Sequence, residues 1–153
     1  MNPFAKFLNP KAIAVVGASR SPEKVGYQVL KNLIDADYSG KLYPVNPNAA
    51  SILKLKAYPT LSAIKHPLDL AIIITPAPLV APIIAEAAEN HISHAIIISA
   101  GFAEAGPKGA ILQQELTHSL IQSPVSVLGP NCLGVLSPVY HLNAAFGPPL
   151  PPK

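Results

Sequence analysis

The segment that most constrains the fold runs from Ala12 to Gly26 and reads AIAVVGASRSPEKVG. An apolar, β-branched run ends at Gly17, a small polar loop containing Pro22 follows, and a helical pattern then begins. A buried strand that turns directly into a helix leaves backbone N–H groups without partners, and the helix N-terminus adds a positive partial charge. This arrangement predicts a binding site for an anion such as phosphate.

Apolar runs of four to six residues recur along the chain, with helical patterns between most of them. The runs are Ala12–Val16, Leu42–Val45, Leu70–Thr75, Ala95–Ser99 and Val125–Leu128. Both faces of each run are apolar, as strands covered on both sides require. This alternation predicts an α/β fold, namely a Rossmann-like, doubly wound, mainly parallel sheet of about five or more strands with helices on both faces.

Three segments show helical periodicity. The first places Val25, Val29 and Leu33 on one face, and the other two, Pro78–Asn90 and Pro107–Gln122, each begin at a proline. The less regular segment 49–65 is expected to be a connection with one short helix.

The loops that would follow the five strands are all small, polar or proline-rich. They are GASRSPEKVG after the first strand, then Asn46–Asn48, Thr75–Pro78, Ser99–Phe102 and Gly129–Cys132. Short loops between strands and helices often have this composition. Because the carboxyl ends of parallel strands meet at one edge, however, five such loops together favour a ligand groove there.

Composition excludes several classes of protein. The chain has 153 residues, which is the length of one domain, and no apolar run reaches the ~18 residues of a membrane span. The net charge of +3 is small and the basic residues are scattered, so we expect no nucleic-acid partner but mild attraction for a small polyanion. The single Cys132 cannot form an internal disulfide, which favours a cytoplasmic location.

The first loop departs from the dinucleotide fingerprint G-x-G-x-x-G. Ala18 and Ser19 stand where the next glycine would fall, and the second strand ends at Asn46 without the acidic residue that holds a ribose. An NAD(P)-binding redox domain is therefore the weaker alternative. Instead, Ser19, Arg20 and Lys24 offer hydroxyl and cationic donors to phosphate oxygens.

The ordered motifs resemble a known family. The chain reads LNPKAIAVVGASRSPEKVGYQVLKNL, then GKLYPVNP, DLAIIITPAPLV, AIIISAGFAEAG and LGPNCLGV. This series resembles the N-terminal coenzyme A (CoA)-binding domain of nucleoside-diphosphate-forming (ADP-forming) acyl-CoA synthetases and, more distantly, the succinyl-CoA synthetase α subunit. The same module is found in certain protein lysine acetyltransferases.

The resemblance implies CoA or acyl-CoA as the ligand and assigns its contacts. The residues implied are Gly17, Ala18, Ser19, Arg20 and Lys24 for the diphosphate, Val45, Asn46 and Pro47 for the adenosine, Thr75, Pro76 and Ala77 after the third strand, Ile98, Ser99, Ala100 and Gly101 beside the pantetheine, and Asn131 and Cys132 at the thiol end. Where the succinyl-CoA synthetases use a lysine, this chain has Asn48. Arg20 and Lys24 are then the alternative partners of the 3′-phosphate.

The resemblance also limits what this chain is expected to do. A lone cysteine beside Gly-Pro-Asn is more often a packed residue than a nucleophile, and the five histidines lack the spacing of a metal site. We therefore expect no catalytic and no metal-binding residue, and further synthetase domains or subunits as partners. The expected division is residues 1–146 for the CoA-binding domain and 147–153 for a proline-rich tail or linker. A fragment of a synthetase, a stand-alone binder and a scaffold without ligand stay open.

Overall fold

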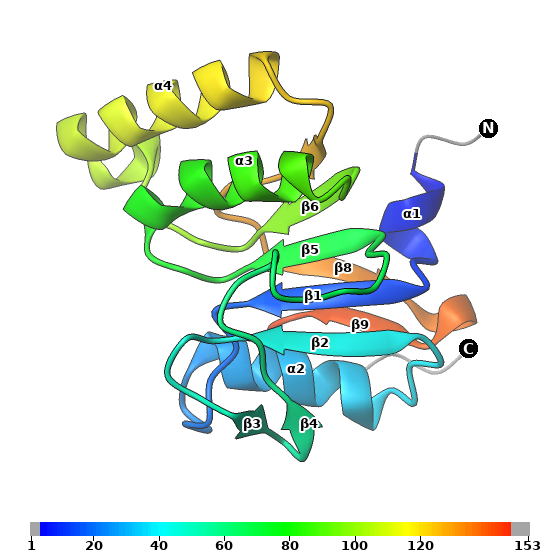
Figure 1. The fold of residues 1–153 in the computed structure, drawn as a ribbon. Coiled ribbons are helices and arrows are strands. Elements are labelled where there is room, and N and C mark those ends of the chain that lie inside the picture. The colour runs from blue at the N-terminus through cyan, green and yellow to red at the C-terminus, as the bar shows by residue number, and fades with distance from the viewer. Residues whose placement is uncertain (1–3, 148–153) are drawn as a thin grey trace.

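The computed structural model describes residues 4–147 and contains one central parallel sheet (Figure 1). Its strands lie in the order β2-β1-β5-β6-β7. They are β1 (Ala12–Val16), β2 (Lys41–Val45), β5 (Leu70–Ile73), β6 (His94–Ile97) and β7 (Ser126–Leu128). Each neighbouring pair is parallel, so the predicted doubly wound α/β fold is confirmed.

Helices cover both faces of this sheet. The helices are α2 (Val25–Asp35), α3 (Val80–Glu89) and α4 (Pro107–Ile121), with a short α1 (Ala5–Leu8) and three 3₁₀ turns, η1 (Ala77–Leu79), η2 (Ala103–Ala105) and η3 (Pro138–Tyr140). In Figure 1, α3 and α4 lie on one side of the sheet and α2 on the other. An antiparallel hairpin of β8 (Gly134–Ser137) and β9 (Leu142–Ala145) shares the α2 side.

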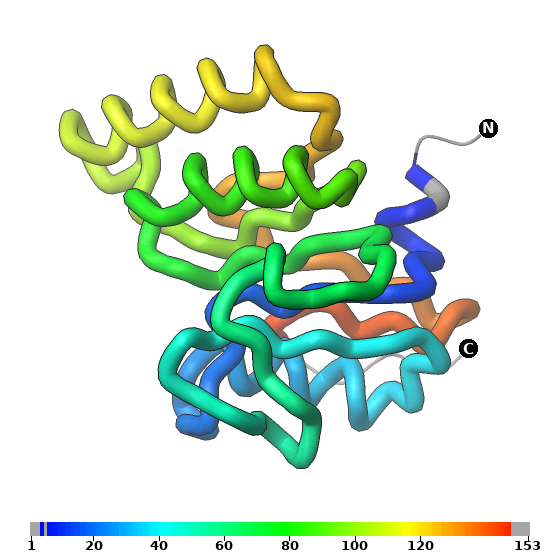
Figure 2. Tube along the Cα trace, viewed as in Figure 1, coloured from blue at the N-terminus to red at the C-terminus, as the bar shows by residue number. Residues whose placement is uncertain are grey.

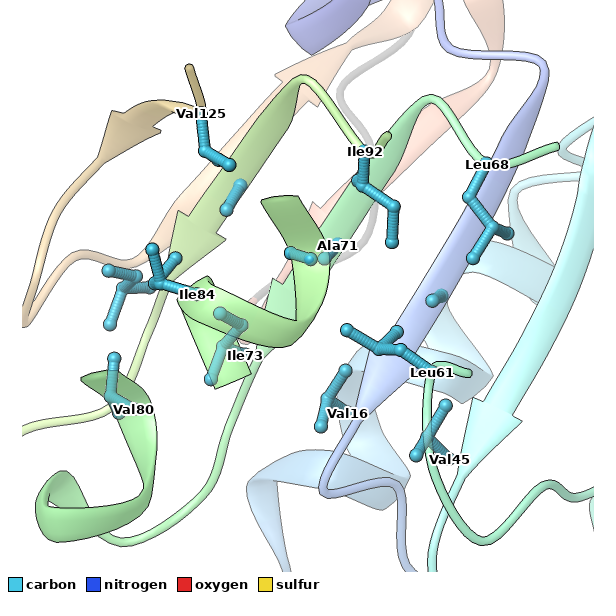
Figure 3. Close-up of a cluster of buried hydrophobic side chains, with 14 of the residues drawn as sticks. Val16, Val45, Leu61, Leu68, Ala71, Ile73, Val80, Ile84, Ile92 and Val125 are labelled. Carbon is cyan, nitrogen blue, oxygen red and sulfur yellow. The ribbon is translucent and has the colours of Figure 1, made fainter. Parts of the chain in front are cut away.

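The alternation of side chains along β1 explains why both faces are apolar. Ala14 and Val16 belong to the hydrophobic cluster beneath α3, whereas Ile13 and Val15 belong to the cluster beneath α2. All four side chains are buried, as the β-branched run predicts. Figure 3 shows the α3-side cluster, in which Ile84 of α3 lies over the sheet.

Two features differ from the sequence-based expectations. Segment 49–65 is described throughout and contains no helix; it holds a hairpin of β3 (Ser51–Ile52) and β4 (Leu55–Lys56). Its turn residues Leu53 and Lys54 adopt φ values of 48° and 65°, a left-handed conformation usually given to Asn-Gly, so the sequence carried no turn signal. The β8–β9 hairpin was likewise not predicted. Its strands are short, and the segment that joins them, around Pro138–Tyr140, contains no Asn-Gly or Asp-Gly turn motif.

The carboxyl ends of the strands share one edge of the sheet. Figure 2 shows the loops after β1, β2 and β5 on the same side of the molecule. Within residues 4–147, no helix is long and apolar enough to cross a membrane. That part of the chain also contains no group of three His, Cys, Asp or Glu side chains able to hold a metal ion.

Candidate functional site

The strand order creates a crevice between β1 and β5. The chain leaves β1 toward β2 on one side, whereas the strands that follow β5 continue on the other side. The loops after β1 and β5 therefore diverge, and ligands of doubly wound sheets bind at this switch point. The site is consequently expected where the loop after β1 (residues 17–24, here loop 1) meets Thr75.

Two glycines allow loop 1 to approach its neighbours closely. Gly17 has a φ of +90°, and a Cβ added there would lie 2.5 Å from the carbonyl oxygen of Ile74. A Cβ on Gly26, in the first turn of α2, would lie 2.0 Å from the carbonyl oxygen of Gly17. These glycines seat the helix N-terminus directly against the end of β1, as the first and third glycines of a dinucleotide fingerprint do.

The side chain of Asn46 fastens loop 1 to the end of β2. Its Nδ2 donates to the carbonyl oxygen of Ala18 at 2.8 Å, and its Oδ1 accepts from the backbone N–H of Asn48 at 2.8 Å. An amide is needed for this arrangement, because a single side chain must both donate and accept. Asn46 thus positions loop 1, a role that its motif alone did not reveal.

A cavity of about 420 Å³ lies on the α3 side of the crevice. We call it the α3-side cavity. Predicted site residues that line it are Gly17, Val45, Asn46, Pro47 and Thr75, and Asn48 of the predicted loop Asn46–Asn48 lines it too. The lining residues that sequence reasoning missed are Val16, Pro59, Thr60, Leu79, Pro82, Ile83 and Glu86. Its walls are mostly aliphatic or proline, which suits a flat, apolar-faced group.

A second cavity of about 240 Å³, the α2-side cavity, lies on the opposite face of the sheet. Predicted residues that line it are Thr75, Ile98, Ser99, Ala100 and Asn131, and the residues missed are Val25, Ile74 and Phe146. None of these side chains is charged, so the cavity favours an uncharged, extended group. Phe146 could not be found from sequence, since the hairpin that carries it to this face was not predicted.

Thr75 lines both cavities. Its Oγ1 is buried and has no hydrogen-bond partner in the described structure. A buried hydroxyl without a partner is uncommon in folded proteins and costs free energy.

The loop after β6 is hydrogen-bonded to the loop after β7, to the end of β5 and within itself. The backbone N–H of Asn131 donates to the carbonyl oxygen of Ser99 at 3.0 Å, and the hydroxyl of Ser99 donates to the carbonyl oxygen of Ile73 at 3.3 Å. The Glu104 carboxylate accepts from the backbone N–H groups of Gly101 and Phe102, and the first of these bonds is the largest cause of its lowered pKa. The wall of the α2-side cavity is therefore preformed.

Comparison with known proteins decides the family. Residues 11–138 match the family described as the CoA binding domain. The chain belongs to that family. This CoA-binding domain is 40% identical over 144 residues to the ADP-forming acetate–CoA ligase I α subunit of Pyrococcus furiosus, a match that covers 92% of the chain and 31% of the relative.

A further relative and a solved structure are also named as a CoA ligase or synthetase. The ADP-forming acetate–CoA ligase II of Archaeoglobus fulgidus is 43% identical over 128 residues, with 84% of this chain and 19% of the relative covered. The structure of a dinucleotide-forming acetyl-coenzyme A synthetase 1 from Ca. Korarchaeum cryptofilum, in complex with phosphate and ADP, superposes with a TM-score of 0.90 at 40% identity. It covers 97% of this chain and 32% of that one. The CoA-binding domain thus spans about a third or less of these proteins.

Several residues predicted for the site line neither cavity of the CoA-binding domain. These are Ala18, Ser19, Arg20, Lys24, Pro76, Ala77, Gly101 and Cys132. The side chains of Ala18 and Ala77 are buried in the two hydrophobic clusters, whereas Arg20 and Lys24 are exposed on loop 1. Ala18 and Ala77 can therefore offer a ligand only backbone groups, while the two cations are accessible from solvent.

Cys132 is packed into the structure of the CoA-binding domain. Its thiol donates to the carbonyl oxygen of Ile97 at 3.3 Å, and burial raises its pKa above the ordinary cysteine value. Less thiolate is therefore present at neutral pH than for a free cysteine, and the thiolate is the nucleophilic form. This environment fits a packed residue better than a nucleophile.

We expect Cys132 to react slowly with iodoacetamide. At pH 7.5 its alkylation rate should be at least tenfold below that of a cysteine in an unfolded control, because both burial and the raised pKa reduce the accessible thiolate. The rate should rise as the pH increases beyond the ordinary cysteine range. Mass spectrometry of time points measures this rate, and alkylation as fast as in the unfolded control would contradict the packed role.

Proposed function

We propose that this domain binds CoA or a short acyl-CoA across the switch point, as the CoA-binding part of an ADP-forming acyl-CoA synthetase. The observation that carries the proposal is the pair of cavities on opposite faces of the sheet, both of which are lined by Thr75. A long ligand with two dissimilar ends can fill both cavities at once. CoA has such ends, a nucleotide and a pantetheine arm.

The adenosine end fits the α3-side cavity. Val45 and Ile83 offer aliphatic surface to the faces of a purine ring, and Pro82 adds a rigid apolar edge. This placement agrees with the family assignment of adenosine to the segment after the second strand.

The diphosphate is placed at loop 1. The first N–H groups of an α-helix generally lack intrahelical partners. In α2 the N–H of Tyr27 bonds to the carbonyl oxygen of Lys24 at 3.0 Å, and the Lys24 side chain makes no capping bond. These groups and the helix dipole attract an anion at this point. Arg20 and Lys24 are the exposed cations of the same loop.

The pantetheine arm is assigned to the α2-side cavity. Thr75 lines this cavity as well as the α3-side cavity, so it joins the two proposed parts of the site. Asn131 lies at the other wall, next to Cys132, so the thiol of the ligand would end there. The side chains of this domain therefore bind and orient the coenzyme, while the thioester chemistry is assigned to other parts of the synthetase.

A thermal-shift experiment with CoA, NAD, NADP and ATP tests the proposal. A ligand present at a hundred times its Kd stabilises a folded protein by about 2.7 kcal/mol. CoA should therefore raise the Tm, whereas NAD and NADP should leave it unchanged. Stabilisation by NAD without stabilisation by CoA would contradict the proposal, and a folded protein that responds to none of them would favour a scaffold without ligand.

Arg20→Ala and Lys24→Ala should each weaken CoA binding about tenfold. A hydrogen bond to a charged group contributes roughly 1.5–3 kcal/mol, and each cation is accessible on loop 1. Isothermal titration calorimetry measures the change. Lys41→Ala is the matched control, since Lys41 is exposed at the amino end of β2, away from the site. If both loop variants bind CoA as tightly as the control, backbone amides alone hold the diphosphate.

A further inference from the structure

We infer that the 3′-phosphate of CoA stays in solvent outside the α3-side cavity, so that this domain binds 3′-dephospho-CoA about as well as CoA. The inference rests on the proposed function, because it assumes that the adenosine occupies this cavity. It concerns the charges that surround the adenosine.

The charge that lines the α3-side cavity is negative. Glu86 is the one charged residue among the described residues of its wall. The Oε1 atom of Glu86 accepts from the backbone N–H of Ser62 at 2.9 Å and from the Ser62 hydroxyl at 2.8 Å. These bonds hold the carboxylate in place, so it does not turn away when a ligand enters.

Two lysines of the segment beside this wall contact groups outside the cavity. The Nζ of Lys65 donates to the carbonyl oxygen of Ser62 at 2.9 Å, and the Nζ of Lys56 lies 5.1 Å from the centre of the Tyr58 ring. Neither lysine lines the cavity. Arg20 and Lys24 belong to loop 1, where the proposed function assigns them to the diphosphate.

The neutral residues at the rim do not replace a cation. One N–H of the Asn46 amide donates to the carbonyl oxygen of Ala18, and its Oδ1 accepts from the backbone N–H of Asn48. A phosphate monoester carries about two negative charges near neutral pH. Placing it beside Glu86 without a cation would be unfavourable, since a charge removed from water needs an opposite charge or hydrogen bonds. In solvent the same group remains hydrated and contributes little to affinity.

The expected selectivity differs from that of a site with a phosphate-binding cation. A charged hydrogen bond to the 3′-phosphate would favour CoA by about tenfold or more. Here we expect the two Kd values to agree within about threefold at 0.15 M salt, where exposed charges are screened beyond about 8 Å. The Arg20→Ala and Lys24→Ala variants should lose the same factor for both ligands, because they act at the shared diphosphate.

Calorimetric titration of the protein with CoA and with 3′-dephospho-CoA tests this inference. CoA binding more than tenfold tighter than 3′-dephospho-CoA would overturn it while leaving the proposed function intact. Binding of neither ligand would overturn the proposed function and the inference with it. The two failures are thus distinguishable in one experiment.

Asn48→Lys provides the positive control. A lysine at this rim position places a cation near the solvent-exposed 3′-phosphate, so the variant should bind CoA about five- to tenfold tighter than 3′-dephospho-CoA. Asn48→Gln keeps the length without the charge and should retain the equal affinities. An Asn48→Lys protein that still binds both ligands equally would overturn the placement of the phosphate beside this rim.

Discussion

Replacing Gly26 with alanine is expected to destabilise the domain by about 3 kcal/mol and to abolish measurable CoA binding. The new Cβ would lie 2.0 Å from the carbonyl oxygen of Gly17, which is backbone and cannot rotate away. Overpacking of this kind costs typically 1–3 kcal/mol or more. Its relief would move α2 away from β1 and spoil the anion site. For a domain of this size, the Tm should fall by roughly 6–12 °C.

The expected loss of stability is opposite to the usual effect of replacing glycine with alanine in a helix. At an ordinary helix position, glycine to alanine stabilises by up to about 1 kcal/mol, because glycine loses more backbone entropy on folding. Gln28→Ala is the matched control, since Gln28 is exposed on the same helix and should change the Tm little. Thermal unfolding of the two variants provides the comparison. A Gly26→Ala protein as stable as the wild type would show that α2 does not rest against Gly17.

The second large effect is expected at Asn46. Asn46→Asp keeps the acceptor for the backbone N–H of Asn48 but loses the donor to the carbonyl oxygen of Ala18. An unsatisfied carbonyl costs about 1–3 kcal/mol, and the new negative charge also lies beside the proposed diphosphate position. CoA affinity should therefore fall about a hundredfold, as measured by calorimetry.

Asn48→Asp distinguishes the effect of the added charge from the effect of the hydrogen bond that Asn46→Asp loses. It adds the same charge close by, but the bond between residues 48 and 46 uses the backbone N–H of Asn48 and survives the substitution. Its CoA affinity should fall only two- to fivefold. Equal losses in the two variants would mean that charge alone accounts for the effect and that the bond to Ala18 does not position loop 1.

A strand or helix could be predicted from the sequence where its own residues show a clear pattern, such as an apolar run or an initial proline. The apolar run Ala12–Val16 forms β1 with these same bounds, and Pro107 begins α4 as its fixed φ favours. The hairpin around Leu53 was not predictable, because its turn residues adopt a conformation that their types seldom take. Leu53 packs against the α2-side cluster, so tertiary contacts accompany the local strain.

The loops of the site could be predicted from the sequence, but several residues that line its cavities could not. Strand order brings Gly17, Asn46 and Thr75 together once the sheet is parallel, so their positions after apolar runs were informative. Glu86 and Phe146 reach the cavities from a helix face and from beyond a hairpin. No local motif marks such residues, since their proximity depends on how α3 and β9 pack on the sheet.

The central claim is that CoA crosses the sheet edge from the α3-side cavity to the α2-side cavity. Amide chemical-shift mapping during titration with CoA tests it most directly. We predict saturable shifts at loop 1, at Thr75 and at Asn131, which together span both cavities. Shifts confined to one cavity, or shifts located away from the carboxyl edge of the sheet, would contradict the account.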